Sequence, residues 1–210
     1  MTAATVELGQ AIVAVPDRNL NLADPADWDR AAALVGAPAI AVMTAEHGVR
    51  VRDVTQPGRQ QPADTLVTAQ PGLALAALAA DCVPVALAGP GVVAVVHAGW
   101  RGVLDGAVPA ALAHLTGTAT GPFTAVIGPS ICGNCYEVPA QRVAEFAQRQ
   151  PAAVRGTRHL DLAAAVIDQL AGVQITHIAG CTLERADLCS YRGGDQERRG
   201  GIIAALRHPS

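Results

Sequence analysis

The stretch that decides the fold reads DCVPVALAGPGVVAVVHAGWRG over residues 81–102. It contains two apolar segments, Cys82–Leu87 and Val92–His97, whose length and composition predict strands. The second segment breaks at Gly99, where the sequence indicates the start of a helix. Strand-to-helix turns expose side chains at the rim of a sheet, and the free amide groups of a helix start favour anions. We therefore expect a functional site here.

The rest of the chain alternates between strand and helix patterns, which predicts an α/β fold. The other predicted strands are Ala11–Val15, Ala39–Met43, Val49–Val54, Asp64–Thr68, Leu73–Leu78, Thr124–Ile127, Ile175–Ala179 and Ile202–Leu206. The predicted helices are Asp27–Val35, Arg101–Leu115, Ala140–Gln150 and Leu160–Leu170. The predicted loops, 56–62 and 116–122, are too short to divide the chain, so we expect one domain over residues 1–210.

The composition of the chain excludes several classes of function. The chain has 210 residues, half of them apolar, with a net charge of -3 and 3% aromatic residues. Nucleic acid is not an expected partner, because there is no basic stripe and there are few rings for stacking. No uninterrupted apolar run reaches membrane-spanning length, and the N-terminus lacks the pattern of a signal peptide. We expect a cytoplasmic protein with no membrane partner.

The basic and sulfur-containing residues exclude further classes. All 15 basic residues are arginine, which excludes Schiff-base chemistry on lysine and a lysine-dependent phosphate loop. The five cysteines are an odd number for a cytosolic chain, so a disulfide framework is not expected.

Three residues supply the ligand set of a catalytic zinc site. His47, Cys82 and His97 provide three protein ligands and leave a fourth position open, and a mixed Cys and His set suits zinc. Their wide spacing also fits a buried small cysteine and two structural histidines. A third interpretation is a Cys82 thiolate activated by His97 as a metal-free nucleophile. The zinc and nucleophile interpretations compete for one sulfur atom.

A set of short motifs occurs in order along the chain. The motifs are NLNL (19–22), EHG (46–48), ADCVPV (80–85), HAGWRG (97–102), IGP (127–129), CYEV (135–138) and SYR (190–192). In these motifs the chain resembles the laccase-domain family, whose members are variously labelled multicopper polyphenol oxidase, peptidoglycan editing factor and purine nucleoside phosphorylase. The resemblance implies a four-layer α-β-β-α sandwich with a metal pocket whose ligands match His47, Cys82 and His97. It also implies phosphorolysis of adenosine, inosine and methylthioadenosine, adenosine deamination, and a link to cell-wall precursor editing.

The sequence argues against one of these labels and departs from the family pattern in two places. Six histidines without a His-x-His pair are too few for a multicopper oxidase. The family's glycine pair before the Asn-Leu motif is absent from Val13–Leu22. Near the C-terminus, Tyr191–Asp195 replaces the usual Tyr-Arg-Arg-Asp-Gly, which puts an anion-binding arginine in question.

Other residues are weaker candidates. Arg101, in the first turn of a predicted helix, and Arg192 are candidates for binding phosphate, and Asn21 for binding substrate. Asp81 is a candidate for orienting a ligand, although strand alternation would turn it away from Cys82. A four-cysteine zinc site from Cys132, Cys135, Cys181 and Cys189 is disfavoured by the wide second pair, and a Cys-x-x-Cys redox pair is an alternative. The remaining histidines, 114, 159, 177 and 208, are expected at the surface or in caps.

The sequence thus predicts a zinc-dependent purine nucleoside phosphorylase and adenosine deaminase, with copper as a substitute metal. Its expected partners are a nucleoside and phosphate, and its expected state is a monomer or homodimer. The alternatives are a hydrolase that uses Cys82 and His97 on an amide of a cell-wall precursor, and a ligand-binding protein without catalytic activity.

Overall fold

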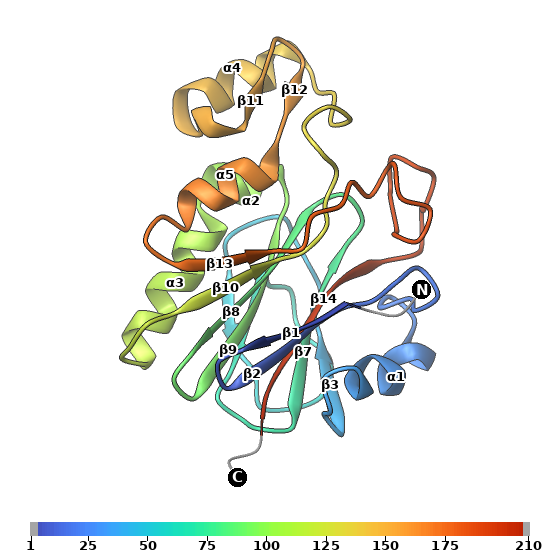
Figure 1. Cartoon of the computed structure of the whole chain (residues 1–210), viewed down its shortest axis with the longest axis vertical. Coiled ribbons are helices and arrows are strands. Elements are labelled where there is room, and N and C mark those ends of the chain that lie inside the picture. Colours follow the sequence, from blue (N-terminus) through green and yellow to red (C-terminus); the bar gives the residue numbers. More distant parts are fainter. Residues whose placement is uncertain (1–3, 208–210) are drawn as a thin grey trace.

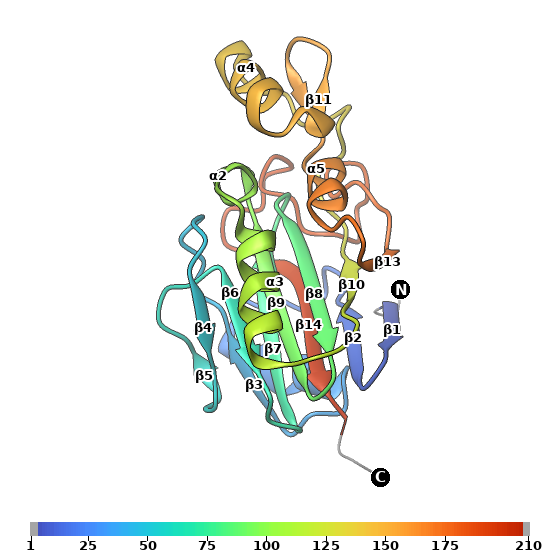
Figure 2. The same cartoon turned by 90° about the vertical axis from the view of Figure 1, so that its left-hand side faces the viewer.

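A computed structural model describes residues 4–207 as one domain of four layers. Two six-stranded sheets pack face to face, with α1 on one outer side and α2, α3 and α5 on the other (Figure 1). Figure 2 shows α3 lying across one sheet, with the second sheet behind it. The predicted α-β-β-α sandwich is therefore confirmed.

The first sheet has the strand order β1-β2-β14-β7-β3-β5. Its strands are β1 (Ala4–Leu8), β2 (Ala11–Val15), β14 (Gly200–Leu206), β7 (Leu73–Ala79), β3 (Ala39–Val42) and β5 (Gly58–Arg59). Pairing is antiparallel from β1 to β7 and parallel from β7 to β5. This sheet therefore joins the two ends of the chain in neighbouring strands.

The second sheet has the strand order β13-β10-β8-β9-β6-β4. Its strands are β13 (Gln174–His177), β10 (Thr124–Ile127), β8 (Val83–Gly89), β9 (Val92–Ala98), β6 (Thr65–Thr68) and β4 (Val51–Asp53). The central strands β8 and β9 are the two apolar segments of residues 81–102. A separate hairpin of β11 (Val154–Arg155) and β12 (His159–Leu160) lies beside α4 at one end of the molecule (Figure 1).

The helices are α1 (Trp28–Ala33), α2 (Trp100–Asp105), α3 (Ala107–Thr118), α4 (Ala140–Arg149) and α5 (Leu162–Gln169), with short 3-10 turns at Pro25–Asp27 and Pro151–Ala153. The predicted helix Arg101–Leu115 is two helices, because Gly106 adopts a left-handed conformation, with a φ of 86°, and ends α2. None of the helices in residues 4–207 is long and apolar enough to cross a membrane.

Strand alternation distributes the apolar side chains over three cores. In β9, Val95 faces the first sheet, whereas its neighbours Ala94 and Val96 face the helices. In β14, Ile202 faces the second sheet and Ile203 faces α1. Because both faces of each sheet are covered, the central strands are apolar at nearly every position.

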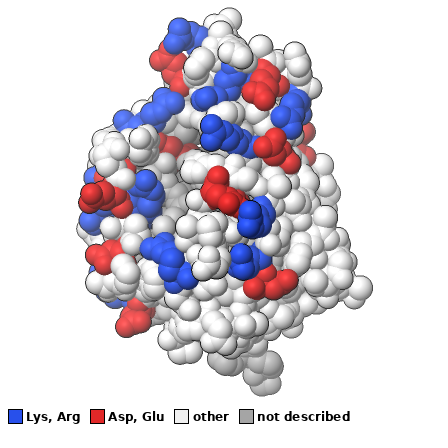
Figure 3. Space-filling view, turned by 180° about the vertical axis from the view of Figure 1, so that it is seen from behind, with Lys and Arg blue, Asp and Glu red and all other residues white. Residues whose placement is uncertain are grey.

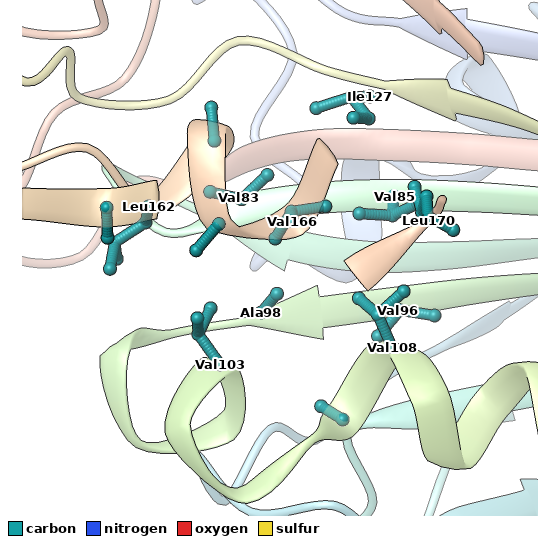
Figure 4. Close-up of a cluster of buried hydrophobic side chains, with 14 of the residues drawn as sticks. Val83, Val85, Val96, Ala98, Val103, Val108, Ile127, Leu162, Val166 and Leu170 are labelled. Atoms are coloured by element: carbon teal, nitrogen blue, oxygen red, sulfur yellow. The ribbon is translucent and has the colours of Figure 1, made fainter. Parts of the chain in front are cut away.

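The core between the second sheet and its helices is built mainly from branched aliphatic side chains (Figure 4). Val83 and Val85 of β8 and Val96 of β9 meet Val103 and Val108 of the helices α2 and α3 there. Burying a side chain of this size stabilises the fold by about 1.5–3 kcal/mol. This packing fixes β8, β9 and α2 relative to one another at the end of the sheet where the site lies.

Candidate metal centre and cleft

The register between β8 and β9 brings Cys82 to the helix start at Gly99. These antiparallel strands pair Val83 with Ala98 and Pro84 with His97, so Cys82 and Gly99 are opposite each other one step further along. A Cβ atom built on Gly99 would lie 3.2 Å from the Cys82 Sγ atom. A thiol and an imidazole therefore share the end of the two central strands.

His47 reaches the same place from the loop after β3. It has a left-handed backbone, with a φ of 63°, which is uncommon for a residue other than glycine. The carboxylate of Asp64 holds this loop, because it accepts hydrogen bonds from the backbone N–H groups of His47 (2.8 Å) and Gly48 (2.7 Å). These bonds fix a strained conformation that directs the His47 ring toward the strand ends.

The three predicted ligands lie together. The ligand atoms of His47, Cys82 and His97 are all within 4.8 Å of one another, and the two imidazole rings are nearly perpendicular, with centroids 4.7 Å apart. His97 is buried, Cys82 is half-buried and His47 is exposed. The cluster therefore opens to solvent on one side, as a catalytic metal site requires.

Asp64 also orients His97. The Asp64 side chain is fully buried, and its Oδ1 atom lies 3.1 Å from His97 Nδ1. Burial alone would raise the pKa of Asp64, but hydrogen bonds from His97 and Gly48 lower it below its usual value. The ionised carboxylate accepts the Nδ1 proton, which leaves the other ring nitrogen of His97 free to bind a metal.

Gly99 provides the space in which these groups converge. A Cβ atom there would lie 3.0 Å from His47 Cδ2 and 3.4 Å from His97 Cε1. Both contacts are tight, so a larger residue would push the ligands apart. The two histidines and the cysteine point toward one place, a carboxylate supports one of the histidines, and the glycine keeps the space between them free. This arrangement fits a zinc ion.

Without a metal, the same atoms form a thiolate and imidazolium pair. Burial would raise the pKa of Cys82, but hydrogen bonds with His47 and His97 lower it to about 6. Burial would lower the pKa of His97, but hydrogen bonds with Asp64 and Cys82 raise it to about 9. At neutral pH the sulfur is charged and ready to act as a ligand or as a nucleophile.

The cluster lies in a cleft with a volume of about 700 Å³. Its walls combine aromatic rings with guanidinium groups, contributed by Trp100, Tyr136, Tyr191, Arg59, Arg142, Arg192 and Arg199. On the face shown in Figure 3, arginine and acidic side chains are interspersed over the upper part, and the lower part carries few charges. The size and lining suit a small aromatic ligand with an anionic group.

The structure separates the other predicted binding residues. Arg192 lines the cleft, and its guanidinium carbon lies 5.1 Å from the Tyr136 ring centroid. Arg101 is exposed, lies over the Trp100 ring at 4.8 Å, and is not part of the cleft lining. Asn21 is also outside the lining, and its side-chain oxygen accepts hydrogen bonds from Ala23 and Arg199. Asn21 therefore supports two residues of the cleft wall.

Asp81 anchors the wall of the cleft, and the hydrogen bonds to its carboxylate come from residues other than the three ligands. It is buried, has a φ of 89°, and joins β7 of one sheet to β8 of the other. Its carboxylate accepts hydrogen bonds from Thr182 Oγ1 (2.7 Å), Ser190 Oγ (2.7 Å) and the backbone N–H of Arg192 (2.8 Å). The C-terminal segment that carries Arg192 is thereby fixed beside the cleft.

Three of the remaining histidines, all in the described part of the chain, lie away from the cleft lining. His114 pairs with Asp53 at an exposed site, His159 is in β12, and His177 is exposed in β13. His208 lies outside the described residues.

Sequence reasoning missed Asp64 and Arg142. Asp64 appeared only as the first residue of a strand, although an acidic residue next to a run of buried positions must find partners. Arg142 lines the cleft from the first turn of α4, and its guanidinium carbon is 3.9 Å from the Trp100 ring centroid. Only the tertiary arrangement brings α4 to this cleft, so the sequence had no local signal for it.

Residues 13–207 match the family described as multi-copper polyphenol oxidoreductase laccase, and the chain belongs to this family. Its relatives carry other names. A protein of Streptomyces coelicolor named a purine nucleoside phosphorylase is 42% identical, covering 92% of this chain and 89% of the relative. One of Deinococcus radiodurans with the same name is 35% identical, covering 93% and 86%.

A protein from an unknown prokaryotic organism, named an adenosine deaminase, is 34% identical over 66% of this chain and 58% of its own length. Among solved structures, YlmD from Geobacillus stearothermophilus has a TM-score of 0.81 at 25% identity, covering 96% of this chain and 93% of its own. The hypothetical protein YfiH of Bacillus licheniformis has a TM-score of 0.80 at 21% identity, covering 98% and 97%, which supports the fold alone.

Proposed function

We propose that this chain is a zinc-dependent purine nucleoside enzyme. It would catalyse phosphorolysis of adenosine, inosine and methylthioadenosine and the deamination of adenosine. The names of relatives that are 35% and 42% identical over most of the chain support this class of reaction. The observation that carries the proposal is the cluster of His47, Cys82 and His97 inside a cleft lined by aromatic rings and arginines.

The residues of the cluster would hold the metal, and Asp64 would keep His97 in the tautomer that can bind it. When bound, zinc supplies Lewis acid catalysis to an attacking oxygen at neutral pH. The fully buried Asp64 carboxylate and the glycine at position 99 keep the ligand side chains in place during turnover.

In phosphorolysis, a phosphate oxygen bonds to C1′ of the ribose while the bond from C1′ to the purine nitrogen breaks, and the purine leaves with a proton. In deamination, water adds to C6 of the purine and ammonia leaves. Only the first reaction needs a phosphate site. Arg142 and Arg192 line the cleft, and both lie close to Tyr136, which is also close to Cys82. We assign phosphate binding to this pair because guanidinium groups beside the cluster can form charge-assisted hydrogen bonds with a phosphate.

Paired substitutions test this assignment. We expect Arg192→Ala to slow phosphorolysis by roughly 10- to 150-fold, the equivalent of losing a charge-assisted hydrogen bond of about 1.5–3 kcal/mol. Deamination should slow less, because no phosphate takes part. Arg101→Ala is the matched control, since Arg101 also lies over an aromatic ring but outside the cleft lining. A larger loss of phosphorolysis in Arg101→Ala than in Arg192→Ala would return the phosphate site to the helix start at Arg101.

One observation favours a second function. The lowered pKa of Cys82, about 6, also suits a nucleophile that attacks an amide, for example in a cell-wall precursor, with His97 taking the thiol proton and returning it to the leaving amine. Alkylation of Cys82 that zinc prevents, with nucleoside turnover that requires zinc, would support the zinc enzyme. A covalent acyl adduct on Cys82 in active, metal-free protein would support the hydrolase. Nucleoside binding with no turnover under either condition would point to a binding protein. Cytoplasmic location and a monomeric or dimeric state remain predictions.

A further inference from the structure

A second group of metal-binding side chains lies outside the cleft. The sulfur atoms of Cys132, Cys135 and Cys181 and a carboxylate oxygen of Glu184 are all within 4.8 Å of one another, and none of these residues lines the cleft. We propose that these four residues form a structural zinc site that stabilises the cleft wall. We call them the cysteine cluster.

The ligands come in two closely spaced pairs. Cys132 and Cys135 are three positions apart, and so are Cys181 and Glu184. Such spacing is typical of structural zinc sites, in which each pair lies on one tight turn. The sequence disfavours a four-cysteine site because seven residues separate Cys181 from Cys189, and in the structure Cys189 lies against Gly200. The fourth ligand is a carboxylate, which a search for cysteines alone misses.

The distances suit a single metal ion. Thiolates bound to one tetrahedral zinc at about 2.3 Å lie roughly 3.8 Å apart, within the spread of this cluster. The three cysteines of the cluster are free thiols in the structure, and Cys135 Sγ donates a hydrogen bond to Glu184 Oε1 at 3.5 Å. A zinc ion would replace the shared proton and neutralise the carboxylate. Three thiolates favour zinc over hard cations such as Mg²⁺ or Ca²⁺.

The two turns are fixed by the protein before any metal binds. The backbone N–H groups of Cys135 and Tyr136 both donate to the Cys132 carbonyl at 3.0 Å, and Glu184 N–H donates to the Cys181 carbonyl at 3.2 Å. The backbone N–H of Cys132 donates to Cys181 Sγ at 3.3 Å. A hydrogen bond of this kind supports a thiolate ligand and links the two turns directly.

The position of the cluster gives the metal a structural role. Tyr136, next to Cys135, lines the cleft. Thr182, next to Cys181, donates to the buried Asp81 carboxylate that also holds Arg192. A metal that joins the two turns would therefore hold two parts of the cleft wall in register. With four protein ligands the site is closed, and a closed zinc site has no position for a reacting molecule.

Metal counting tests the proposal. Tag-free protein made with zinc in the medium is measured by elemental mass spectrometry. We expect about two zinc ions per chain in the wild type, and one in each of Cys135→Ser and Cys82→Ser. Cys189→Ser is the matched control and should keep two, because that buried cysteine lies outside both clusters. Zinc content that is the same in Cys135→Ser as in the wild type would overturn the proposal.

Two further measurements keep the test decisive if Cys135→Ser does not fold. Glu184 is exposed, so Glu184→Gln should fold normally and lose zinc from the cysteine cluster to a chelator faster than the wild type. In Cys82→Ser protein loaded with cobalt, the remaining thiolate-to-metal charge-transfer band should report three sulfur ligands. A disulfide between Cys132 and Cys135 in freshly isolated protein would instead support a redox pair. Unchanged chelator kinetics in Glu184→Gln would mean that the cysteine cluster holds no zinc.

Discussion

The two clusters of metal-binding side chains differ in what surrounds them. The cleft cluster of His47, Cys82 and His97 has three ligands, a buried carboxylate behind it and open space in front. The cysteine cluster has four ligands, lies on two turns and is outside the cleft lining. Both clusters contain cysteine, so the number of ligands and the access for a reacting molecule distinguish a catalytic metal site from a structural one.

The largest expected effect comes from Cys82→Ser. A hydroxyl is a poor substitute for a thiolate on zinc, so zinc affinity in the cleft should fall by more than the ~100-fold that loss of a supporting hydrogen bond costs. Nucleoside turnover should fall to background. Zinc in the cysteine cluster should remain, as elemental analysis would show. Turnover at the wild-type rate in this variant would mean that the cleft zinc takes no part in the reaction.

The second largest expected effect is a difference between the two clusters in how their zinc affinity depends on pH. Zinc must displace the proton of His97, whose pKa is about 9, whereas Cys82, with a pKa of about 6, is already a thiolate at neutral pH. Affinity of the cleft for zinc should therefore rise about tenfold per pH unit from pH 6 toward 9 and then level off. Below pH 6 it should fall more steeply, because two protons compete.

The zinc affinity of the cysteine cluster should not level off near pH 9. Burial, and then hydrogen bonds with Cys132, Cys181 and Glu184, raise the pKa of Cys135 to about 12. Zinc must therefore displace the Cys135 proton over the whole pH range of the experiment. Competition with a chelating dye from pH 6 to 10, in Cys82→Ser for one cluster and Cys135→Ser for the other, measures both slopes. Identical slopes above pH 9 would contradict this difference.

Asp64→Asn should have a smaller effect, confined to the cleft cluster. The amide cannot accept all the hydrogen bonds that His47, Gly48 and His97 donate, so zinc affinity in the cleft should fall by about 10- to 100-fold. Asp53→Asn is the matched control, because Asp53 pairs with His114 at an exposed site. Calorimetric titration of metal-free protein with zinc measures both. Equal losses in the two variants would mean that Asp64 has no specific role.

The smallest effect is expected from Thr182→Val, which removes one hydrogen bond to Asp81. Ser190 and Arg192 still donate to that carboxylate, so we expect a loss of about 1–2 kcal/mol in the free energy of unfolding. For a chain of this size, this lowers Tm by roughly 2–8 °C. Zinc content should not change in either cluster. Thr176→Val, at an exposed position of β13, is the control and should leave Tm almost unchanged.

Periodic patterns in the sequence predicted most of the fold. All ten predicted strands overlap strands of the structure, because long apolar runs bounded by turn residues have few alternatives. The strand β1 was missed because it is mostly exposed and lies at the edge of its sheet. The break at Gly106 was missed because an isolated glycine does not always end a helix.

The site was less accessible to sequence reasoning. The structure brings together His47, Cys82 and His97, which motif resemblance singled out, and it places Arg192 in the cleft but not Arg101 or Asn21. Asp64, Arg142 and Glu184 have no distinctive local pattern. Their roles depend on which loops meet in space, and that information is distributed over the whole chain.

The salt bridge between Arg18 and Asp195 has a consequence for engineering. Arg18 donates to both carboxylate oxygens of Asp195, at 2.7 and 2.5 Å, and Asp195 is buried. The bridge joins the segment after β2 to the segment before β14. A redesign of the segment around Arg18 that removes this arginine would leave a buried carboxylate without its charged partner, so the two segments have to be redesigned together.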